Sequence, residues 1–86
     1  MKLIRFEAVW CPSCLIMKQR FKKINLENIE EIVYNYDLDE EMRNYYHIGD
    51  YLPIVILEKE GKEIFRFSGE KSISELEDII NKYKEQ

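Results

Sequence analysis

The sequence predicts an α/β fold in which a four-stranded mixed sheet carries helices on both faces, in the order β-α-β-α-β-β-α. Three observations lead to this prediction. The first half of the chain reads as strand, helix, strand. A continuous apolar run over residues 54–57, a charged turn and a second apolar segment read as a hairpin. The C-terminal part begins with a capping box, Ser72-x-x-Glu75, and continues as an amphipathic helix.

Length and composition indicate one globular domain over residues 1–86. Hydrophobic residues make up 45% of the chain and charged residues 35%, and 86 residues leave no room for a second core. The formal net charge of -4 provides no overall attraction to nucleic acid or to anionic lipid. We therefore expect neither as a partner.

The first three elements are expected to form a parallel unit. A strand is predicted from about Lys2 to Val9, a helix from about Cys11 to Ile24, and a strand from Glu31 to Asp37. Alternation along the first strand places Ile4, Phe6 and Ala8 on one face and Leu3, Arg5 and Glu7 on the other. Strand, helix and strand within this distance imply a right-handed parallel crossover.

The next helix is expected to be short, from about Glu40 to Tyr46, with Asp39 as its candidate N-cap. It should bury Met42 and one of the two tyrosines Tyr45 and Tyr46.

The second half is expected to form a hairpin and a final helix. Pro53 opens the apolar strand Ile54–Leu57, a position that tolerates proline, and this strand should be covered on both faces. A turn over Glu58–Lys62 leads to a strand over Glu63–Phe67. The last helix follows Ser72 and presents one apolar face made of Ile73, Leu76, Ile79, Ile80 and Tyr83.

The only two cysteines, Cys11 and Cys14, lie where the first strand gives way to the first helix. Two intervening residues leave Cys11 outside the first turn and Cys14 one turn in, close enough for a disulfide. Pro12 suits the first helical position, and the free N–H groups and positive dipole end of the helix stabilise a thiolate at Cys11. The pair can thus attack a disulfide through Cys11 and resolve the mixed disulfide through Cys14.

Metal binding is the alternative use of two thiols at this spacing. A closed zinc site needs four ligands, and the rest of the chain offers one histidine, His47, and carboxylates. A cluster or copper ion shared between two chains also fits two thiolates per subunit. Neither is favoured, so we expect no metal and no bound organic cofactor, and we expect His47 to end the second helix without a catalytic role.

The compartment expected from the sequence is the cytoplasm. Arg5 and Glu7 interrupt the N-terminal apolar run, so it lacks the core of a signal peptide, and no run approaches membrane-spanning length. In a reducing compartment, a CxxC pair indicates chemistry rather than a structural disulfide.

The segment Phe6-Glu7-Ala8-Val9-Trp10-Cys11-Pro12-Ser13-Cys14 resembles the active-site segment of thioredoxins. The likeness continues in Tyr36–Asp39, in Tyr46–Ile48 with Leu52-Pro53, and in Gly61 and Phe67–Gly69. It covers nearly the whole chain, in a compact form without the extra N-terminal strand and helix of full-length thioredoxins. In size the chain is closer to glutaredoxins.

The resemblance implies a substrate-binding surface around the two cysteines. Pro53 is expected to form a cis peptide bond and to lie beside them, and the backbone of Leu52 is expected to pair with an extended substrate segment. Trp10 and Pro12 are expected to contact the substrate, with Trp10 partly exposed. Tyr51 and Ile54 are weaker candidates for the same surface.

The chain departs from the thioredoxin pattern at two places. Thioredoxins carry a buried acid five positions before the tryptophan, where it assists deprotonation of the second cysteine, and here that position is Arg5. Glu7 lies on the same strand face and is either a substitute for that acid or a surface carboxylate. Between the cysteines, Pro12-Ser13 replaces the usual Gly-Pro and resembles the glutaredoxin motif, which changes the redox poise in a direction the sequence does not reveal.

The function predicted is that of a thiol:disulfide oxidoreductase that reduces protein disulfides through Cys11 and Cys14. Its expected partners are protein disulfide substrates and a reductase or low-molecular-weight thiol as electron donor, and the chain is expected to be a monomer. One alternative is a glutathione-dependent, glutaredoxin-like reductase. Against it, Trp10 precedes the motif, and Ser68-Gly69-Glu70 differs from the Gly-Gly-Asp with which glutaredoxins hold glutathione. A redox-sensing binding module is the other alternative.

Overall fold

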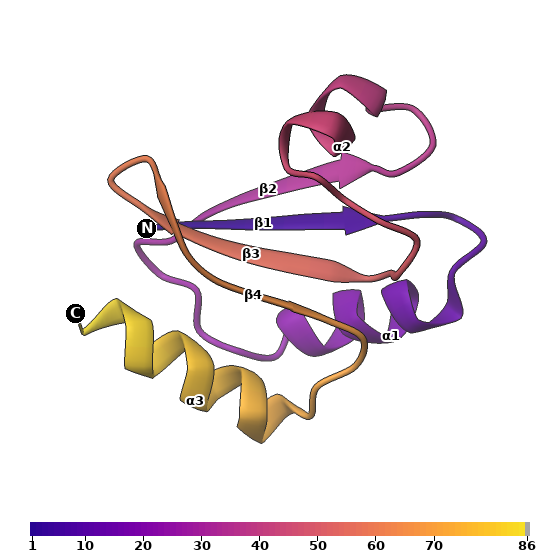
Figure 1. The fold of residues 1–86 in the computed structure, drawn as a ribbon. Coiled ribbons are helices and arrows are strands. Elements are labelled where there is room, and N and C mark those ends of the chain that lie inside the picture. Colours follow the sequence, from indigo (N-terminus) through magenta and orange to yellow (C-terminus); the bar gives the residue numbers. More distant parts are fainter. Residues whose placement is uncertain (86) are drawn as a thin grey trace.

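The computed structural model describes residues 1–85 and contains four strands and three helices in the predicted order. Gln86, the last residue of the predicted domain, lies outside the described residues. The elements are β1 (Lys2–Glu7), α1 (Pro12–Phe21), β2 (Glu30–Asn35), α2 (Glu40–Tyr45), β3 (Ile54–Lys59), β4 (Lys62–Ser68) and α3 (Ile73–Lys84). Figure 1 shows α1 and α3 together on one side of the sheet and α2 on the other. The predicted arrangement of helices on both faces is confirmed.

The sheet is mixed, with strand order β2-β1-β3-β4. β1 runs parallel to β2, with Ile4 opposite Ile32, and antiparallel to β3, with Leu3 opposite Leu57. β3 and β4 form the predicted antiparallel hairpin, with a bulge at Leu57/Glu58. The two central strands are therefore β1 and β3, and the apolar run of β3 is buried on both faces as its sequence indicates.

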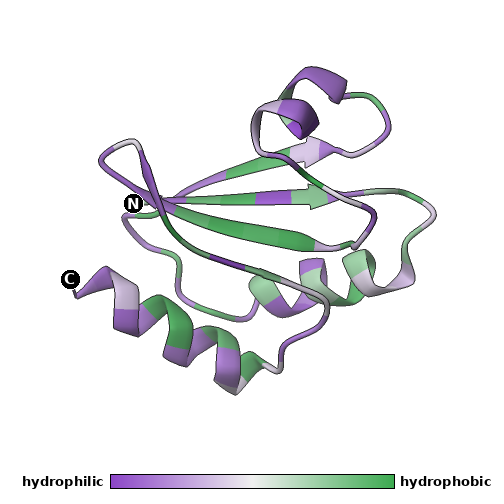
Figure 2. Ribbon diagram, viewed as in Figure 1, coloured by the Kyte–Doolittle hydropathy of each residue, from purple (hydrophilic) through white to green (hydrophobic). Residues whose placement is uncertain are grey.

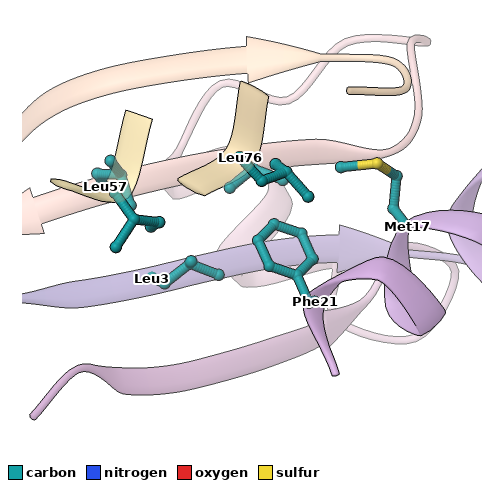
Figure 3. Close-up of a cluster of buried hydrophobic side chains, with 7 residues drawn as sticks. Leu3, Met17, Phe21, Leu57 and Leu76 are labelled. Carbon is teal, nitrogen blue, oxygen red and sulfur yellow. The ribbon is translucent and has the colours of Figure 1, made fainter. Parts of the chain in front are cut away.

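The larger part of the core lies between the sheet and the helices α1 and α3. Figure 3 shows side chains from β1, α1, β3 and α3 meeting there, and the full buried cluster is Leu3, Met17, Phe21, Val55, Leu57, Leu76 and Ile80. Each fully buried aliphatic or aromatic side chain contributes about 1.5–3 kcal/mol by leaving water. This packing fixes α1 against the sheet and so fixes the position of its N-terminus.

The opposite face of the sheet carries the smaller core. Its buried members are Ile4, Phe6, Tyr46, Ile54 and Ile56, with Met42 of α2 packed against them. Of the two adjacent tyrosines, Tyr46 is buried and Tyr45 is exposed, which settles the alternative left by the sequence. In Figure 2 the central strand β3 is mostly green and α2 is mostly purple, so this short helix packs on the sheet through few apolar side chains.

Several predicted boundaries were too long. β1 ends at Glu7, two residues earlier than expected, and Val9 beyond it is 94% exposed. α1 ends at Phe21, although Ile24 still packs against the core. Apolar character extended both predictions, but an apolar residue in a connecting segment does not have to continue the strand or helix. Val9 is exposed to solvent, and Ile24 packs on the core from outside α1.

Asp39 and Ser72 occupy the predicted N-cap positions of α2 and α3, but only Ser72 caps its helix through its side chain. Asp39 occupies the N-cap position but makes no side-chain bond to α2, because its carboxylate accepts a hydrogen bond from the backbone N–H of Asn35 at 2.7 Å instead. In α3, Ser72 and Glu75 form both bonds of the capping box. None of the helices within residues 1–85 is both long enough and apolar enough to span a membrane.

Candidate active site

The two cysteines are placed by the junction between β1 and α1. Cys11 is the N-cap residue, with an extended backbone, and Pro12 takes the first helical position as predicted. The Cys11 sulfur accepts a hydrogen bond from the backbone N–H of Cys14 at 3.1 Å. A sulfur in this position faces the unpaired N–H groups of the first turn, where negative charge is stabilised. Both thiols are free.

Burial distinguishes the two thiols. Cys14 is 3% exposed and Cys11 8% exposed, and together with Ala8 they form a small cluster against which Tyr36 and Leu52 pack. Burial, followed by the interaction with Cys11, raises the pKa of the Cys14 thiol to about 12. Cys14 is therefore protonated at neutral pH and must lose its proton before it can attack a disulfide.

The loop before β3 contributes Leu52 and Pro53 to the site. The Leu52–Pro53 peptide bond is cis, as the resemblance implied. Leu52 packs on the cysteine cluster, and Pro53 is buried. The carbonyl oxygen of Pro53 accepts a hydrogen bond from the N–H of Gly69 at 2.9 Å, which joins this loop to the segment between β4 and α3.

Trp10 stands beside the pair and is 57% exposed, in agreement with the expectation of a partly exposed side chain. Its indole N–H donates to the carboxylate of Asp37 at 2.8 Å, and its ring packs edge-on against Tyr36, with centroids 6.1 Å apart. The guanidinium of Arg43 in α2 lies 4.7 Å from the centroid of the Tyr36 ring. Trp10 is thus oriented by residues that follow β2 and by α2.

Sequence reasoning assigned no role to Asp37, Tyr36 or Arg43. Tyr36 and Asp37 could have been found from the strand order. They follow β2, the cysteines follow β1, and the carboxyl ends of these two parallel strands lie at the same edge of the sheet. The sequence contains no comparable signal for Arg43, which reaches this edge from the opposite face.

A second set of polar contacts surrounds Ser13, one of the two residues between the cysteines. The hydroxyl of Ser13 donates to the carboxylate of Glu70 at 2.7 Å. The other carboxylate oxygen of Glu70 lies 3.7 Å from the guanidinium of Arg20. These partners are 57 positions apart in the sequence for Ser13 and Glu70, so no local pattern indicates the contact.

A groove of about 460 Å³ runs between α1 and the edge strand β2, and both cysteines line it. Glu7, Lys18 and Asp39 also line it. Glu7 therefore shares a groove with Cys14, whereas Arg5 is directed elsewhere and is 7% exposed beneath the ring of Phe21. The fold thus brings Glu7, the candidate substitute for the missing acid, into one groove with both thiols.

Three candidate residues lie apart from the cysteines. Tyr51 and Ile54 line a different groove of about 250 Å³, together with Arg66 and Phe67. His47 is exposed just after α2, in a left-handed backbone conformation. In residues 1–85, no three histidine, cysteine or acidic side chains stand together as a metal site would require.

A four-stranded mixed sheet with a CxxC pair at the start of α1 and a cis-proline loop packed against that pair defines a thioredoxin-fold protein. The sequence matches the Thioredoxin family model over residues 1–82, so the chain belongs to the thioredoxin family. Family and fold together support a thiol:disulfide oxidoreductase in general.

Several of the solved structures that resemble this chain are thioredoxins. Thioredoxin 1 of the thermophilic eubacterium Thermosipho africanus has 27% identity and a TM-score of 0.84, over 99% of this chain and 96% of that protein. Fasciola hepatica thioredoxin has 25% identity and a TM-score of 0.84, over 94% and 78%. Trypanosoma brucei brucei thioredoxin has 20% identity and a TM-score of 0.86, over 99% and 75%, a similarity that supports the fold alone. No curated protein matches the chain significantly in sequence.

Proposed function

We propose that this protein reduces the disulfides of other proteins, with Cys11 as the nucleophile and Cys14 as the resolving thiol. The observation that supports this most directly is the hydrogen bond from the Cys14 N–H to the Cys11 sulfur at the start of α1. The N–H donor and the positive end of the helix dipole favour negative charge on a sulfur held in this way, and the thiolate is the reactive form.

The first step is attack of the Cys11 thiolate on one sulfur of the substrate disulfide. A new S–S bond forms between Cys11 and that sulfur, the substrate S–S bond breaks, and the other substrate sulfur leaves as a thiolate that takes up a proton.

In the second step, Cys14 loses its proton and its sulfur attacks Cys11. The Cys11–Cys14 disulfide forms, and the second substrate thiol is released after protonation. The substrate disulfide gains two electrons and two protons, and the protein dithiol loses them. A reductase or a low-molecular-weight thiol then has to return these electrons.

Substrate binding in this proposal uses the surface around the pair. Trp10 and Pro12 are exposed next to Cys11, and Leu52 packs on the cysteine cluster just before the cis-proline Pro53. An extended substrate segment pairs with the backbone at Leu52, in the manner of an added strand. We also propose that the protein works in a reducing compartment such as the cytoplasm, as a monomer, and without a metal or bound organic cofactor.

The test is turnover of a protein disulfide, such as oxidised insulin, with dithiothreitol as the electron donor. The wild-type protein should accelerate reduction, Cys11→Ala should abolish the acceleration, and Cys14→Ala should accumulate a mixed disulfide on Cys11. If Cys14→Ala accumulates nothing on Cys11, the assigned roles are wrong. If only glutathionylated substrates are turned over, and only with glutathione, the glutaredoxin-like alternative replaces this proposal.

The same turnover measurement distinguishes an enzyme from a redox-sensing module. An enzyme passes many electron pairs per molecule, whereas a sensor changes its affinity for a partner once per oxidation. A wild-type protein that is oxidised stoichiometrically but does not turn over would favour the sensor.

A further inference from the structure

Residues 69–72 connect β4 to α3 and contact both the cis-proline loop and helix α1. The N–H of Gly69 donates to the carbonyl oxygen of Pro53 at 2.9 Å, and the N–H of Lys71 contacts the sulfur of Met17 at 3.3 Å. The guanidinium of Arg20 donates to the carbonyl oxygen of Lys71 at 2.9 Å. This connecting segment therefore holds the cis-proline loop and helix α1 at a fixed separation.

Glu70 is the member of this segment that reaches the redox motif itself. One carboxylate oxygen accepts the hydroxyl hydrogen of Ser13 at 2.7 Å, and the other lies 3.7 Å from the guanidinium of Arg20. Ser13 is in the first turn of α1, one residue from Pro12 and two from the N-cap Cys11. The structure thus places a carboxylate at the end of the helix where Cys11 takes on negative charge.

We propose that Glu70, held at the N-terminus of α1 by its hydrogen bond to Ser13, makes the dithiol couple more reducing through its negative charge. This inference rests on the proposed function, since it concerns the potential of the same cysteine pair. The carboxylate repels the Cys11 thiolate, so it destabilises the dithiol state relative to the disulfide, in which neither sulfur is charged. A destabilised dithiol gives up its electrons more readily.

The charges around Glu70 set the size of this effect. Arg20 of α1 forms an ion pair with it. Lys71 and the α3 residue Glu75 lie in the same region, where hydrogen bonds with Ser72, followed by the charges of Lys71 and Arg20, lower the pKa of Glu75. The Glu70 and Arg20 side chains are 39% and 33% exposed, so water screens both charges. We therefore expect the Glu70 charge to have a moderate effect on the potential of the cysteine pair.

The first test is the equilibrium between the protein and glutathione at pH 8, where two thiols and one glutathione disulfide give one protein disulfide and two glutathiones. Glu70→Gln keeps an oxygen that can accept the Ser13 hydroxyl but removes the charge. We expect its equilibrium constant for protein oxidation to fall about threefold, the scale of a half-exposed charge interaction. The rate of alkylation of Cys11 at pH 7 should rise in the same variant. The matched control, Glu77→Gln on the exposed side of α3, should change neither quantity.

The second test separates tethering from charge. Ser13→Ala leaves the carboxylate in place but removes the hydrogen bond, whereas Ser13→Thr retains a hydroxyl. If the Ser13–Glu70 hydrogen bond positions the motif against the cis-proline loop, Ser13→Ala should raise the KM for a protein disulfide about threefold. Ser13→Thr should keep the KM near the wild-type value.

An unchanged equilibrium constant in Glu70→Gln, or a change of the same size in Glu77→Gln, would overturn the inference. If the proposed function itself is wrong, the wild-type protein will show no reversible two-electron transition with glutathione. Urea unfolding of each variant in the reduced state confirms that folded proteins are being compared.

Discussion

The guanidinium carbon of Arg5 lies 5.0 Å from the centroid of the Phe21 ring, inside the layer between the sheet and α1. This cation is 7% exposed, and its only ion pair in the described structure is a long one, 3.9 Å to the carboxylate of Glu31. The Nε and Nη1 atoms have no hydrogen-bond partner among residues 1–85. A buried cation with so few partners costs free energy that its aromatic contact offsets only in part.

Arg5→Met should therefore stabilise the protein. Methionine keeps the long apolar stem that packs in this layer and removes the poorly solvated charge, a replacement that is often neutral or stabilising. We expect the free energy of unfolding in urea to rise by about 1–2 kcal/mol, the cost of leaving buried polar groups unsatisfied.

Glu31→Gln is the companion variant, because it removes the partner and leaves the cation buried. It should lower the free energy of unfolding by up to about 1 kcal/mol. A loss of stability in Arg5→Met would show that the contact with Phe21 outweighs the desolvation of the cation.

The N-cap position of Cys11 predicts a stability difference between two inactive variants. Cys11→Ser retains a side-chain acceptor for the Cys14 N–H, and Cys11→Ala leaves this N–H without one. Cys11→Ala should therefore be less stable than Cys11→Ser by about 1 kcal/mol. Urea unfolding under reducing conditions measures the difference. Equal stabilities would mean that water replaces the sulfur as acceptor without cost.

Cys14 predicts a loss of stability of the reduced protein at alkaline pH. Burial, followed by the interaction with Cys11, raises the folded-state pKa of this thiol from 9.0 to about 12. The unfolded chain releases the Cys14 proton above pH 9.0, whereas the folded protein keeps it until about pH 12. The protonated Cys14 thiol therefore gives its full stabilisation below the pKa of the unfolded state. This stabilisation is lost as the pH rises toward the pKa of the folded state.

Within this window, the free energy of unfolding should fall by up to roughly 1.4 kcal/mol per pH unit for the one proton involved. Cys14→Ser, compared with the wild type in a phosphine reductant, removes this part of the slope and leaves the contributions of tyrosines and lysines. Parallel slopes for the two proteins would contradict the raised pKa.

Most of the fold could be predicted because each element has a local signal. The apolar run at residues 54–57, the Ser72–Glu75 capping box and the alternation in β1 depend on residues close in sequence, and each prediction is confirmed. The lack of a side-chain cap bond at Asp39 was not predictable in this way, because the N–H of Asn35 competes for the same carboxylate through the turn after β2.

In the candidate site, too, the features with a local motif could be predicted, whereas the contacts between distant residues could not. The cysteine pair, Pro12 and the cis bond at Pro53 have motifs or a family resemblance behind them. The contact of Ser13 with Glu70 joins residues far apart in the chain and depends on how α1 and α3 pack. The position of Glu7 could be narrowed to a strand face, but its place in the groove with Cys14 depends on where β1 ends and α1 begins.

Glu7 gives the last prediction, which concerns the resolving step. The Cys14 thiol is protonated at neutral pH, and Glu7 lines the groove that both cysteines share. A carboxylate there can act in two opposite ways. As a proton acceptor it accelerates the attack of Cys14 on the mixed disulfide. As a fixed negative charge it helps to raise the pKa of Cys14, after burial and the interaction with Cys11, and so slows the same attack.

Glu7→Gln distinguishes the two roles by the sign of its effect. If Glu7 accepts the proton, release of substrate from the preformed mixed disulfide should slow at least about tenfold at pH 7 and should recover as the pH is raised, because hydroxide then replaces the carboxylate. If Glu7 acts only as a charge, release should become faster. Asp39→Asn is the control, since Asp39 lines the same groove but its carboxylate is bonded to the N–H of Asn35. A slower release in Glu7→Gln, with Asp39→Asn unchanged, would mean that the acid absent from position 5 is replaced from position 7 of the same strand face.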